Sequence, residues 1–338
     1  MPRALVIQTS FLGDMVLTTP LISALARHGD VDVVATSASA PLLANHPDVR
    51  HVFRYDKRGA HSGVGGFRAL VQHLRSRDDS DVAYLAQGSL RSAALALVAG
   101  YRQRVGFDTS AGRIFYSRQV QFRKDEHHAG RLWRLAAGDD AEAPGADVLR
   151  PRLYPGVEED AAVARRLDAS GYAGEALIAL APGSVWATKR WPYYADLARR
   201  LTTFGRIVIV GGVDDTPLAA AIVEATSGRA IDTTGQLSLL ASAALLGRSR
   251  ILVTNDSAPQ HLASAMDTPT VALFGPTVPA FGFGPLAARA RIAQVESLTC
   301  RPCDAHGPRT CPLTHWRCMR DLTVDRVMDA IGHVHPGM

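Results

Sequence analysis

Short apolar runs alternate with helical patterns of apolar residues along the whole chain. The runs are typical of buried strands, and after each of them apolar residues recur every three or four positions. This alternation predicts an α/β fold with parallel sheets. In the first part of the chain we expect strands at 5–8, 31–36, 51–55, 82–85 and 119–122 and helices at 16–27, 64–75, 90–99 and 127–137.

Residues 138–155 interrupt this pattern, because they are rich in proline, glycine and acidic residues and have little periodicity. We interpret them as a linker. The alternation then resumes, with strands expected at 176–181, 206–211, 251–254 and 270–274 and helices at 158–170, 193–204, 216–226, 237–247, 258–265 and 324–334. The sequence thus predicts two α/β domains, 1–155 and 156–338, with a cleft between them. Ligands of open parallel sheets bind at the carboxyl ends of the strands, so we expect the chemistry in the loops that follow them.

The composition is that of a soluble globular protein with a substantial core. Hydrophobic residues make up 47% of the 338 positions and charged residues 20%. No apolar run reaches the ~18 residues of a membrane span. The first apolar run is too short for a signal peptide and soon reaches Gly13 and Asp14. We therefore expect the chain to stay in the cytoplasm.

Positive charge is concentrated in the first domain. The chain has a net charge of +5, and residues 50–134 hold 16 basic and 7 acidic residues, a local net charge of +9. A field of this sign favours anionic ligands, although a solvated, arginine-rich surface would look the same. A basic nucleic-acid-binding protein is the alternative class. We expect no nucleic-acid partner, because the chain has no aromatic-rich basic strip.

The first strand leads into a loop that carries Asp14. The loop, TSFLGDM, joins a strand's carboxyl end to a helix that we expect to begin near Val16. Gly13 permits close backbone approach. Asp14 then lies at or near the helix N-cap, where it could simply cap the helix. The functional interpretation is a carboxylate that takes a proton from an attacking hydroxyl.

A second loop of this kind, GSVWATKRWP, offers Ser184, Thr188 and Lys189 at the start of a helix. Backbone N–H groups, a helix dipole and a cation are what a phosphate group needs. A basic surface loop is the plainer interpretation. Lys189 is one of only three lysines in this arginine-rich chain, which favours a specific need for a compact ammonium group.

The segment VTNDSAPQHLASAM places Asp256, Ser257 and Ala258 at a strand-to-helix turn, with His261 one helical turn on. Asp256 or Ser257 would cap the helix, and the amides of the turn could bind diphosphate oxygens. A buried, satisfied histidine is the competing interpretation of His261. Upstream, Asp215 follows a strand and two glycines and could accept hydrogen bonds from a ribose, or could merely cap a turn.

These motifs resemble glycosyltransferase family 9, the heptosyltransferases of lipopolysaccharide core synthesis, over nearly the whole chain. The resemblance is carried by SFLGDMVLTTPLISAL at 10–25, APGSVWATKRWP at 181–192, VTNDSAPQHLASAM at 253–266, TVALFGPT at 270–277 and CRPCDAHGPRTCPLTHWRCM at 300–319. The cysteine-rich segment is most similar to the heptosyltransferase II branch. The resemblance implies a GT-B-type architecture, with two Rossmann-like domains whose parallel sheets face each other across a cleft.

The resemblance also implies an inverting, single-displacement transfer from ADP-heptose to an acidic lipopolysaccharide core, with peripheral contact at the inner membrane. Asp14 matches the family's catalytic base and Lys189 its diphosphate-binding lysine. The family's nucleotide-binding turn is matched by Asp256, Ser257, Ala258 and His261. At the position of Ala258 the family usually has glycine. Fixed donors aimed at a departing diphosphate need no metal cofactor. A relative with another nucleotide sugar or acceptor, or a sugar-nucleotide epimerase, is the alternative within enzymes.

All four cysteines fall in one short segment, at Cys300, Cys303, Cys311 and Cys318. Four thiolates at such spacing resemble a structural zinc or iron site. Reduced thiols and disulfides are the alternatives, and a cytoplasmic location disfavours disulfides. None of these states is needed for sugar transfer. We expect the segment to brace a loop beside the cleft.

Overall fold

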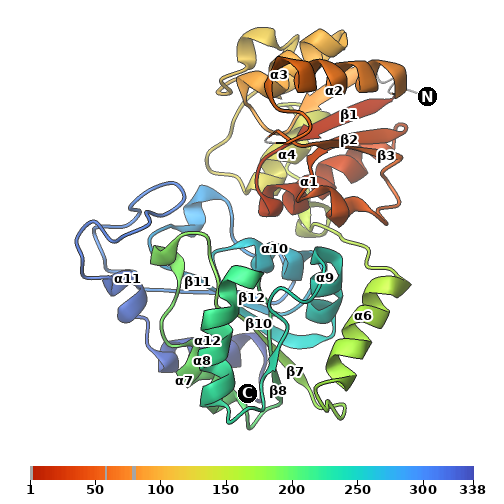
Figure 1. Cartoon of the computed structure of the whole chain (residues 1–338). Coiled ribbons are helices and arrows are strands. Elements are labelled where there is room, and N and C mark those ends of the chain that lie inside the picture. The colour runs from red at the N-terminus through yellow and green to blue at the C-terminus, as the bar shows by residue number, and fades with distance from the viewer. Residues whose placement is uncertain (1–2, 58, 78–80) are drawn as a thin grey trace. The chain divides into compact units, whose positions relative to one another are not determined.

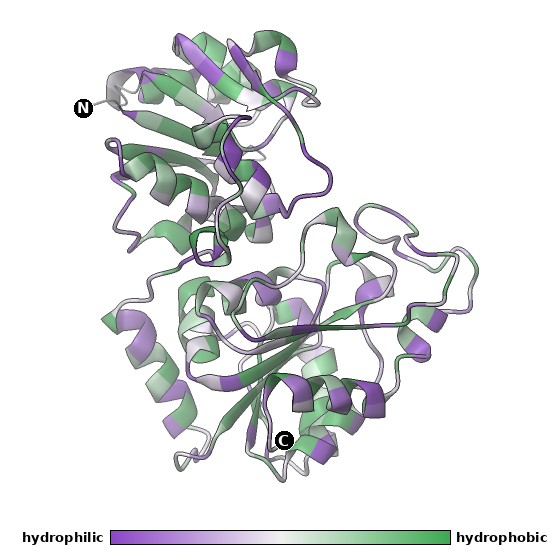
Figure 2. Cartoon of the chain, turned by 180° about the vertical axis from the view of Figure 1, so that it is seen from behind, coloured by the Kyte–Doolittle hydropathy of each residue, from purple (hydrophilic) through white to green (hydrophobic). Residues whose placement is uncertain are grey.

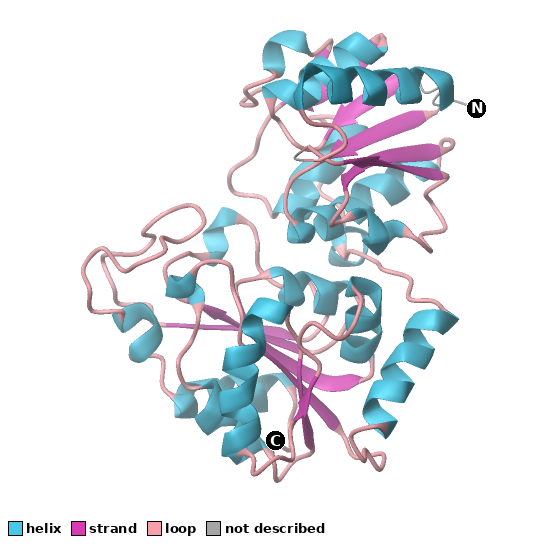
Figure 3. Cartoon of the chain, in the orientation of Figure 1, coloured by secondary structure: helices cyan, strands magenta, loops and turns pink. Residues whose placement is uncertain are grey.

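The computed structural model of the chain describes residues 3–57, 59–77 and 81–338. The chain divides into two compact units, Met1–Tyr154 and Pro155–Met338. In each unit helices cover both faces of one sheet (Figures 1 and 3). None of the helices in the described residues has the length and hydrophobicity that a membrane span requires.

The first unit is built on a six-stranded sheet with the order β3-β2-β1-β4-β5-β6, in which all neighbouring strands are parallel. This is the doubly wound Rossmann order. The strands are β1 (Ala4–Gln8), β2 (Val31–Thr36), β3 (His51–Tyr55), β4 (Val82–Leu85), β5 (Gln103–Phe107) and β6 (Arg118–Val120). The helices are α1 (Leu12–Ala26), α2 (Gly63–Arg77), α3 (Leu90–Ala99), α4 (His128–Ala137) and the short α5 (Ala146–Leu149).

The second unit repeats this topology with the order β12-β11-β10-β7-β8-β9, again all parallel. Its strands are β7 (Leu177–Ala181), β8 (Arg206–Ile209), β9 (Ile231–Asp232), β10 (Ser249–Asn255), β11 (Thr270–Phe274) and β12 (Ala290–Gln294). Its helices are α6 (Val157–Asp168), α7 (Tyr194–Leu201), α8 (Thr216–Ala225), α9 (Leu239–Gly247), α10 (Ala258–Ala265), α11 (Arg317–Arg320) and α12 (Val324–Val334). In both units the strand order reverses beside the first strand, which places a binding site at that point.

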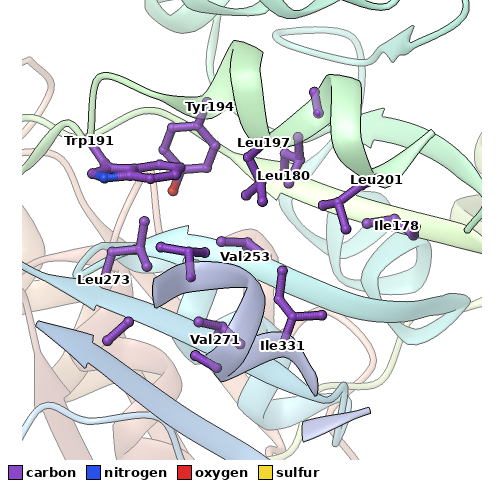
Figure 4. Close-up of a cluster of buried hydrophobic side chains, with 14 of the residues drawn as sticks. Ile178, Leu180, Trp191, Tyr194, Leu197, Leu201, Val253, Val271, Leu273 and Ile331 are labelled. Atoms are coloured by element: carbon purple, nitrogen blue, oxygen red, sulfur yellow. The ribbon is translucent and has the colours of Figure 1, made fainter. Parts of the chain in front are cut away.

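The core of the second unit forms where alternate side chains of the central strands meet α7 and α12 (Figure 4). Ile178 and Leu180 of β7 pack there with Leu197 of α7 and Ile331 of α12, and all four are fully buried. Burial of each such side chain contributes about 1.5–3 kcal/mol. Because helices cover both faces, β7 and β11 are buried along their whole length. Figure 2 shows that hydrophobic residues predominate in the strands of the sheets.

The predicted fold class, two parallel α/β sheets of GT-B type, is confirmed. Three strands were not predicted: β5, β9 and β12. β9 has only two residues, and β12 (ARIAQ) has Arg291 as its second residue and ends in a glutamine. β5 (QRVGF) begins with two polar residues. Each therefore lacks the apolar run from which the other strands were predicted. The expected linker also contains the short helix α5, Ala146–Leu149.

Candidate active site

The reversal point of the second sheet brings together two predicted residues, Lys189 and Asp256. Lys189 lies in a 3-10 turn (Ala187–Lys189) after β7, and Asp256 directly follows β10. β7 and β10 are parallel neighbours, so their carboxyl ends share one edge of the sheet. The Lys189 Nζ atom lies 2.6 Å from Asp256 Oδ2, and the two side chains are only 8% and 10% exposed. The site is therefore a nearly buried ion pair.

Two further side chains donate hydrogen bonds to the Asp256 carboxylate. Thr277, in the loop after β11, donates its hydroxyl to Oδ2 at 2.6 Å. Gln260, on the first turn of α10, donates Nε2 to Oδ1 at 3.0 Å. With Lys189 the carboxylate accepts three hydrogen bonds, and such charge-assisted bonds are strong and directional. The direction of the lysine ammonium is therefore set by a network that reaches three loops.

Thr277 and Gln260 were not predicted as site residues. The sequence contained part of a signal for Thr277, because this residue follows the predicted strand 270–274, which in the structure is β11 and pairs with β10 in parallel. Neighbouring parallel strands bring the residues that follow them to the same edge of the sheet. The pairing itself was not readable from the sequence, so the loop after β11 could be interpreted only as a cover for the donor or as a rigid connection.

Asn255, the last residue of β10, fixes the Lys189 loop to the sheet. Its Oδ1 atom accepts hydrogen bonds from the Trp191 backbone N–H at 3.2 Å and the Tyr194 hydroxyl at 3.3 Å. Its Nδ2 atom donates to the Pro182 carbonyl at 2.8 Å. Asn255 is completely buried, so each of these bonds replaces one that water would otherwise supply. The loop is held at both of its ends by one side chain.

The turn before α10 has the predicted arrangement in part. Ser257 occupies the N-cap position of α10, although its side chain makes no capping hydrogen bond and instead donates to the Asn255 carbonyl at 3.3 Å. Ala258 is the first helical residue and is not among the described residues with positive φ. Its backbone therefore does not require the glycine that the family usually has. His261 is 5% exposed, with Nε2 3.5 Å from Gln260 Nε2.

Of the remaining predicted residues of this unit, Ser184 lies on the Lys189 loop and Asp215 lies in the turn after β8. The Ser184 carbonyl accepts from Arg190 Nε at 2.9 Å, and the Ser184 hydroxyl accepts from the Trp186 N–H at 3.3 Å. Asp215 caps the turn after β8, where its Oδ2 accepts the Gly212 N–H at 3.0 Å. A Cβ atom on Gly183 would lie 2.2 Å from the Asp215 carboxylate. Asp215 is therefore packed against the start of the Lys189 loop.

In the first unit, Asp14 lies on α1 and not at its N-cap. The helix begins at Leu12, so Phe11 is the N-cap and Asp14 is the third helical residue. The predicted helix start near Val16 is wrong, because the helix extends back to Leu12, but Asp14 does lie near the N-cap, in the first turn. Asp14 still contributes to the helix start, since its Oδ2 accepts the Phe11 N–H at 3.3 Å. The side chain is 17% exposed and keeps one face open.

His128, at the start of α4, was not predicted and is the nearest titratable neighbour of Asp14. Its Nε2 atom lies 4.0 Å from Asp14 Oδ1, too far for a hydrogen bond. Burial above all, together with the charges of Arg131 and His127, lowers the pKa of His128 to about 3. The imidazole is therefore neutral at physiological pH and gives Asp14 no positive neighbour. The spacing of the sequence carried no signal for this contact, because α1 and α4 are far apart in the chain.

Two cations lie at the carboxyl ends of the same sheet. Lys57, after β3, donates Nζ to the Thr9 carbonyl at 2.7 Å, in the loop that leads to Asp14. Arg91, on α3, lies over the Tyr55 ring at 5.2 Å from its centre, and Lys57 lies over the same ring at 5.8 Å. Burial lowers the pKa of Lys57, and the charge of Arg91 lowers it further. Two like charges are thus held together over Tyr55, and Lys57 contacts the loop that leads to Asp14; paired positive charge of this kind favours an anionic ligand.

The predicted structural metal site at the four cysteines is not supported. Among the described residues, no three histidine, cysteine, aspartate or glutamate side chains are arranged to hold a metal ion. Cys318 is part of the hydrophobic core with Met319 and Leu322, and burial above all raises the pKa of its thiol to about 11. Cys303 directs its thiol to the Cys300 carbonyl at 3.3 Å. All four cysteines are free thiols.

Comparison with known proteins places this site in a family. The sequence profile described as glycosyltransferase family 9 (heptosyltransferase) matches residues 67–316.

The chain belongs to glycosyltransferase family 9. This confirms the resemblance inferred from the motifs, and the chain is a glycosyltransferase. It is 29% identical to lipopolysaccharide heptosyltransferase 2 of Salmonella typhimurium, over 87% of this chain and 88% of the relative. It is also 29% identical to lipopolysaccharide heptosyltransferase 1 of Pseudomonas aeruginosa, over 89% and 86% of the two chains.

Solved structures agree with the family 9 assignment. The family 9 glycosyltransferase of Veillonella parvula has the same fold, with a TM-score of 0.86, 22% identity and coverage of 98% of this chain and 97% of that chain. The ADP-heptose lipopolysaccharide heptosyltransferase II of E. coli matches with a TM-score of 0.78 and 25% identity, over 98% of both chains.

Proposed function

We propose that this glycosyltransferase moves heptose from ADP-heptose to the inner core of lipopolysaccharide, with inversion at the transferred carbon. The support comes from the heptosyltransferases to which the chain is similar over most of its length. The observation that carries the proposal is the buried Lys189–Asp256 pair at the reversal point of the second sheet. A cation fixed at that position of a Rossmann-like sheet is suited to a nucleotide diphosphate.

In the proposed reaction an acceptor hydroxyl attacks the anomeric carbon of the donor sugar. Asp14 takes the hydroxyl proton as the new glycosidic bond forms. The bond between the sugar and the diphosphate breaks, and ADP leaves with the electron pair. Lys189 and the backbone N–H groups of Ser257 and Ala258 stabilise the charge that develops on the leaving diphosphate. Fixed donors of this kind act without a metal ion.

For the rest of the donor we propose roles that follow the family resemblance. Asp215 accepts hydrogen bonds from the ribose, and Ser184 and Thr188 line the diphosphate. Asp256 acts chiefly through Lys189, because all three of its hydrogen bonds are made inside the protein. His261 lies one turn along α10, beside Gln260. We propose that it faces the nucleotide.

The first unit is proposed to bind the acceptor through charge. A lipopolysaccharide core carries carboxylates and phosphates, and Lys57 with Arg91 forms a paired cation site near Asp14. An anion bound there would relieve the repulsion between the two cations. We place the enzyme in the cytoplasm with peripheral contact at the inner membrane. The basic first unit supports this, because lysine and arginine are attracted to anionic lipid headgroups.

The function is tested by incubating the purified full chain with ADP-heptose and a panel of truncated lipopolysaccharide cores. We expect one acceptor to gain a single heptose by mass spectrometry, with release of ADP. Conversion of the donor without any acceptor would indicate an epimerase instead. Transfer from other nucleotide sugars, but not from ADP-heptose, would contradict the proposed donor.

The acceptor site makes a separate prediction. Arg91→Gln is expected to raise the KM for the acceptor about tenfold while leaving the KM for ADP-heptose unchanged, because charge pairs of this kind contribute about 1.4 kcal/mol or more to binding. Arg102→Gln is the matched control, since Arg102 is an exposed arginine just before β5, at the opposite end of the same sheet. Equal acceptor KM values in the two variants would contradict the acceptor site.

A further inference from the structure

The cysteine-rich segment (300–318) lies directly on the Lys189 loop, although more than a hundred residues separate the two in the sequence. The Thr188 hydroxyl donates a hydrogen bond to the Pro308 carbonyl. The His306 ring stacks on Trp186, with the ring centres 5.3 Å apart and the planes 14° from parallel. Thr188 is 2% exposed, so this hydrogen bond is shielded from water. Residues 306–308 thus contact the loop at two points on either side of Gly307.

Gly307 fits against the side chain of Lys189 itself. Its φ angle is +84°, a conformation that side chains with a Cβ atom rarely adopt. A Cβ atom at this position would lie 3.3 Å from Lys189 Cε and 3.0 Å from Pro276 Cγ. A larger residue here would therefore press against Pro276 and the lysine stem, and one of these neighbours would have to shift by a few tenths of an ångström. The crowded atom of the lysine is Cε, the carbon that bears the ammonium group.

The segment is tied to the same part of the sheet that holds Asp256. The Cys303 N–H donates to the Pro276 carbonyl at 2.9 Å. The Arg301 guanidinium donates to the Thr277 carbonyl at 2.8 Å and to the Phe274 carbonyl at 3.2 Å. Thr277 is the residue whose hydroxyl binds Asp256. The cysteine-rich segment is thus anchored to the loop that forms the far side of the ion pair.

Lys189 is consequently restricted at the end that bears its charge. Its Nζ atom lies 2.6 Å from Asp256 Oδ2 and 5.5 Å from the centre of the Trp186 ring, and the backbone of Gly307 lies so near Cε that a Cβ atom there would be 3.3 Å from it. A free lysine side chain has considerable rotamer entropy, which would otherwise be lost when a ligand binds. Holding the stem before the ligand arrives removes much of this cost.

We propose that residues 306–308 are a positioning element for the diphosphate-binding lysine, so that the cysteine-rich segment is part of the donor site. The proposal rests on the role of Lys189 in the proposed function. The segment does not contact substrate in this proposal. It acts through the lysine by limiting where the ammonium group can go.

Gly307→Ala tests the proposal, with Gly228→Ala as the matched control. Gly228 has a similar φ angle of +77°, but a Cβ atom there would meet nothing within 4 Å. The control therefore reproduces the backbone strain without the contact. We expect Gly307→Ala to weaken ADP binding about tenfold by calorimetry, since small displacements of a binding group have effects of this order. Gly228→Ala should bind ADP like the wild type.

A second measurement follows Lys189 without any nucleotide. The chain has only three lysines, so acylation of each amine by a small reagent can be read by mass spectrometry. Lys124 is exposed and serves as the internal reference. Gly307→Ala is expected to raise the labelling of Lys189 relative to Lys124 severalfold, whereas Gly228→Ala should not. A general loss of packing elsewhere would not single out this lysine.

These measurements separate the possible failures. If the wild type does not bind ADP, the proposed function fails, while the labelling still decides the positioning role. If Gly307→Ala does not fold, His306→Ala removes the stacking contact without backbone strain, and Lys189 labelling should again rise relative to Lys124. Labelling and ADP affinity equal to those of Gly228→Ala would overturn the proposal, as would unchanged labelling in a folded His306→Ala variant.

Discussion

Replacing Asp14 by asparagine is expected to lower the rate of sugar transfer by about 10²–10⁴-fold, the contribution typical of a positioned general base. Asparagine has nearly the same shape and keeps an oxygen that can accept the Phe11 N–H, but it cannot take a proton. The helix start should therefore survive. ADP affinity should stay within about twofold of the wild type, because the donor residues belong to the other unit. The measurements are kcat with saturating substrates and ADP binding by calorimetry.

The matched control is Glu159→Gln. Glu159 is likewise the third residue of its helix, α6, and its Oε2 atom accepts the Gly156 N–H at 2.8 Å. It therefore has the structural role of Asp14 without the proposed chemistry. The control should keep full activity and lose only a few tenths to about 1 kcal/mol of stability. If Asp14→Asn is as active as Glu159→Gln, Asp14 is a helix cap and not the base.

The sequence predicted the loops of the site better than the contacts within it. Lys189 and Asp256 were both expected at carboxyl ends of strands, because apolar runs followed by helix starts identify such positions. That the two side chains form an ion pair depends on β7 lying beside β10, and strand order is a property of the folded sheet. Thr277 reaches Asp256 for the same reason. Contacts that depend on strand order could not be read from a single sequence.

Local signals also misled in two places. The first helix was expected to begin near Val16, because the apolar pattern starts there, but it begins at Leu12, which places Asp14 in its first turn and not before it. The cysteine spacing resembled a metal site because spacing says nothing of burial. Cys318 is part of the core beside Met319, and this environment favours a neutral thiol. The expectation that the segment braces a loop agrees with the contacts of Pro308 and His306.

Replacing Lys189 by methionine is the second substitution with a large expected effect. Methionine keeps most of the apolar stem that packs against Trp186 and Gly307 but removes the ammonium group. We expect ADP affinity to fall about 10²-fold, because the loss of a buried charge partner costs roughly 2–5 kcal/mol. Lys124→Met, at an exposed lysine, is the control and should change nothing.

The same substitution should also destabilise the protein, and this effect can be separated from binding. Methionine leaves the Asp256 carboxylate buried without its cation, at an expected cost of about 3 kcal/mol in the free energy of unfolding. Adding Asp256→Asn should restore much of that stability, because the amide is neutral and can still accept from Thr277. The new amide N–H₂ takes the place of Oδ1, which accepts from Gln260 Nε2 in the wild type, so the Gln260 amide must turn to present Oε1, a buried oxygen that has no hydrogen-bond partner among the described residues.

ADP affinity should not recover in this double variant, since the cation is still missing. Denaturant unfolding and calorimetry on the two single variants and the double variant complete the cycle. Recovery of ADP binding together with stability would show that Lys189 only supports the fold. Recovery of stability alone is the result expected if the lysine holds the diphosphate. The fold requires only that the buried side chain at position 256 has no unpaired charge, whereas the diphosphate requires the positive charge of Lys189.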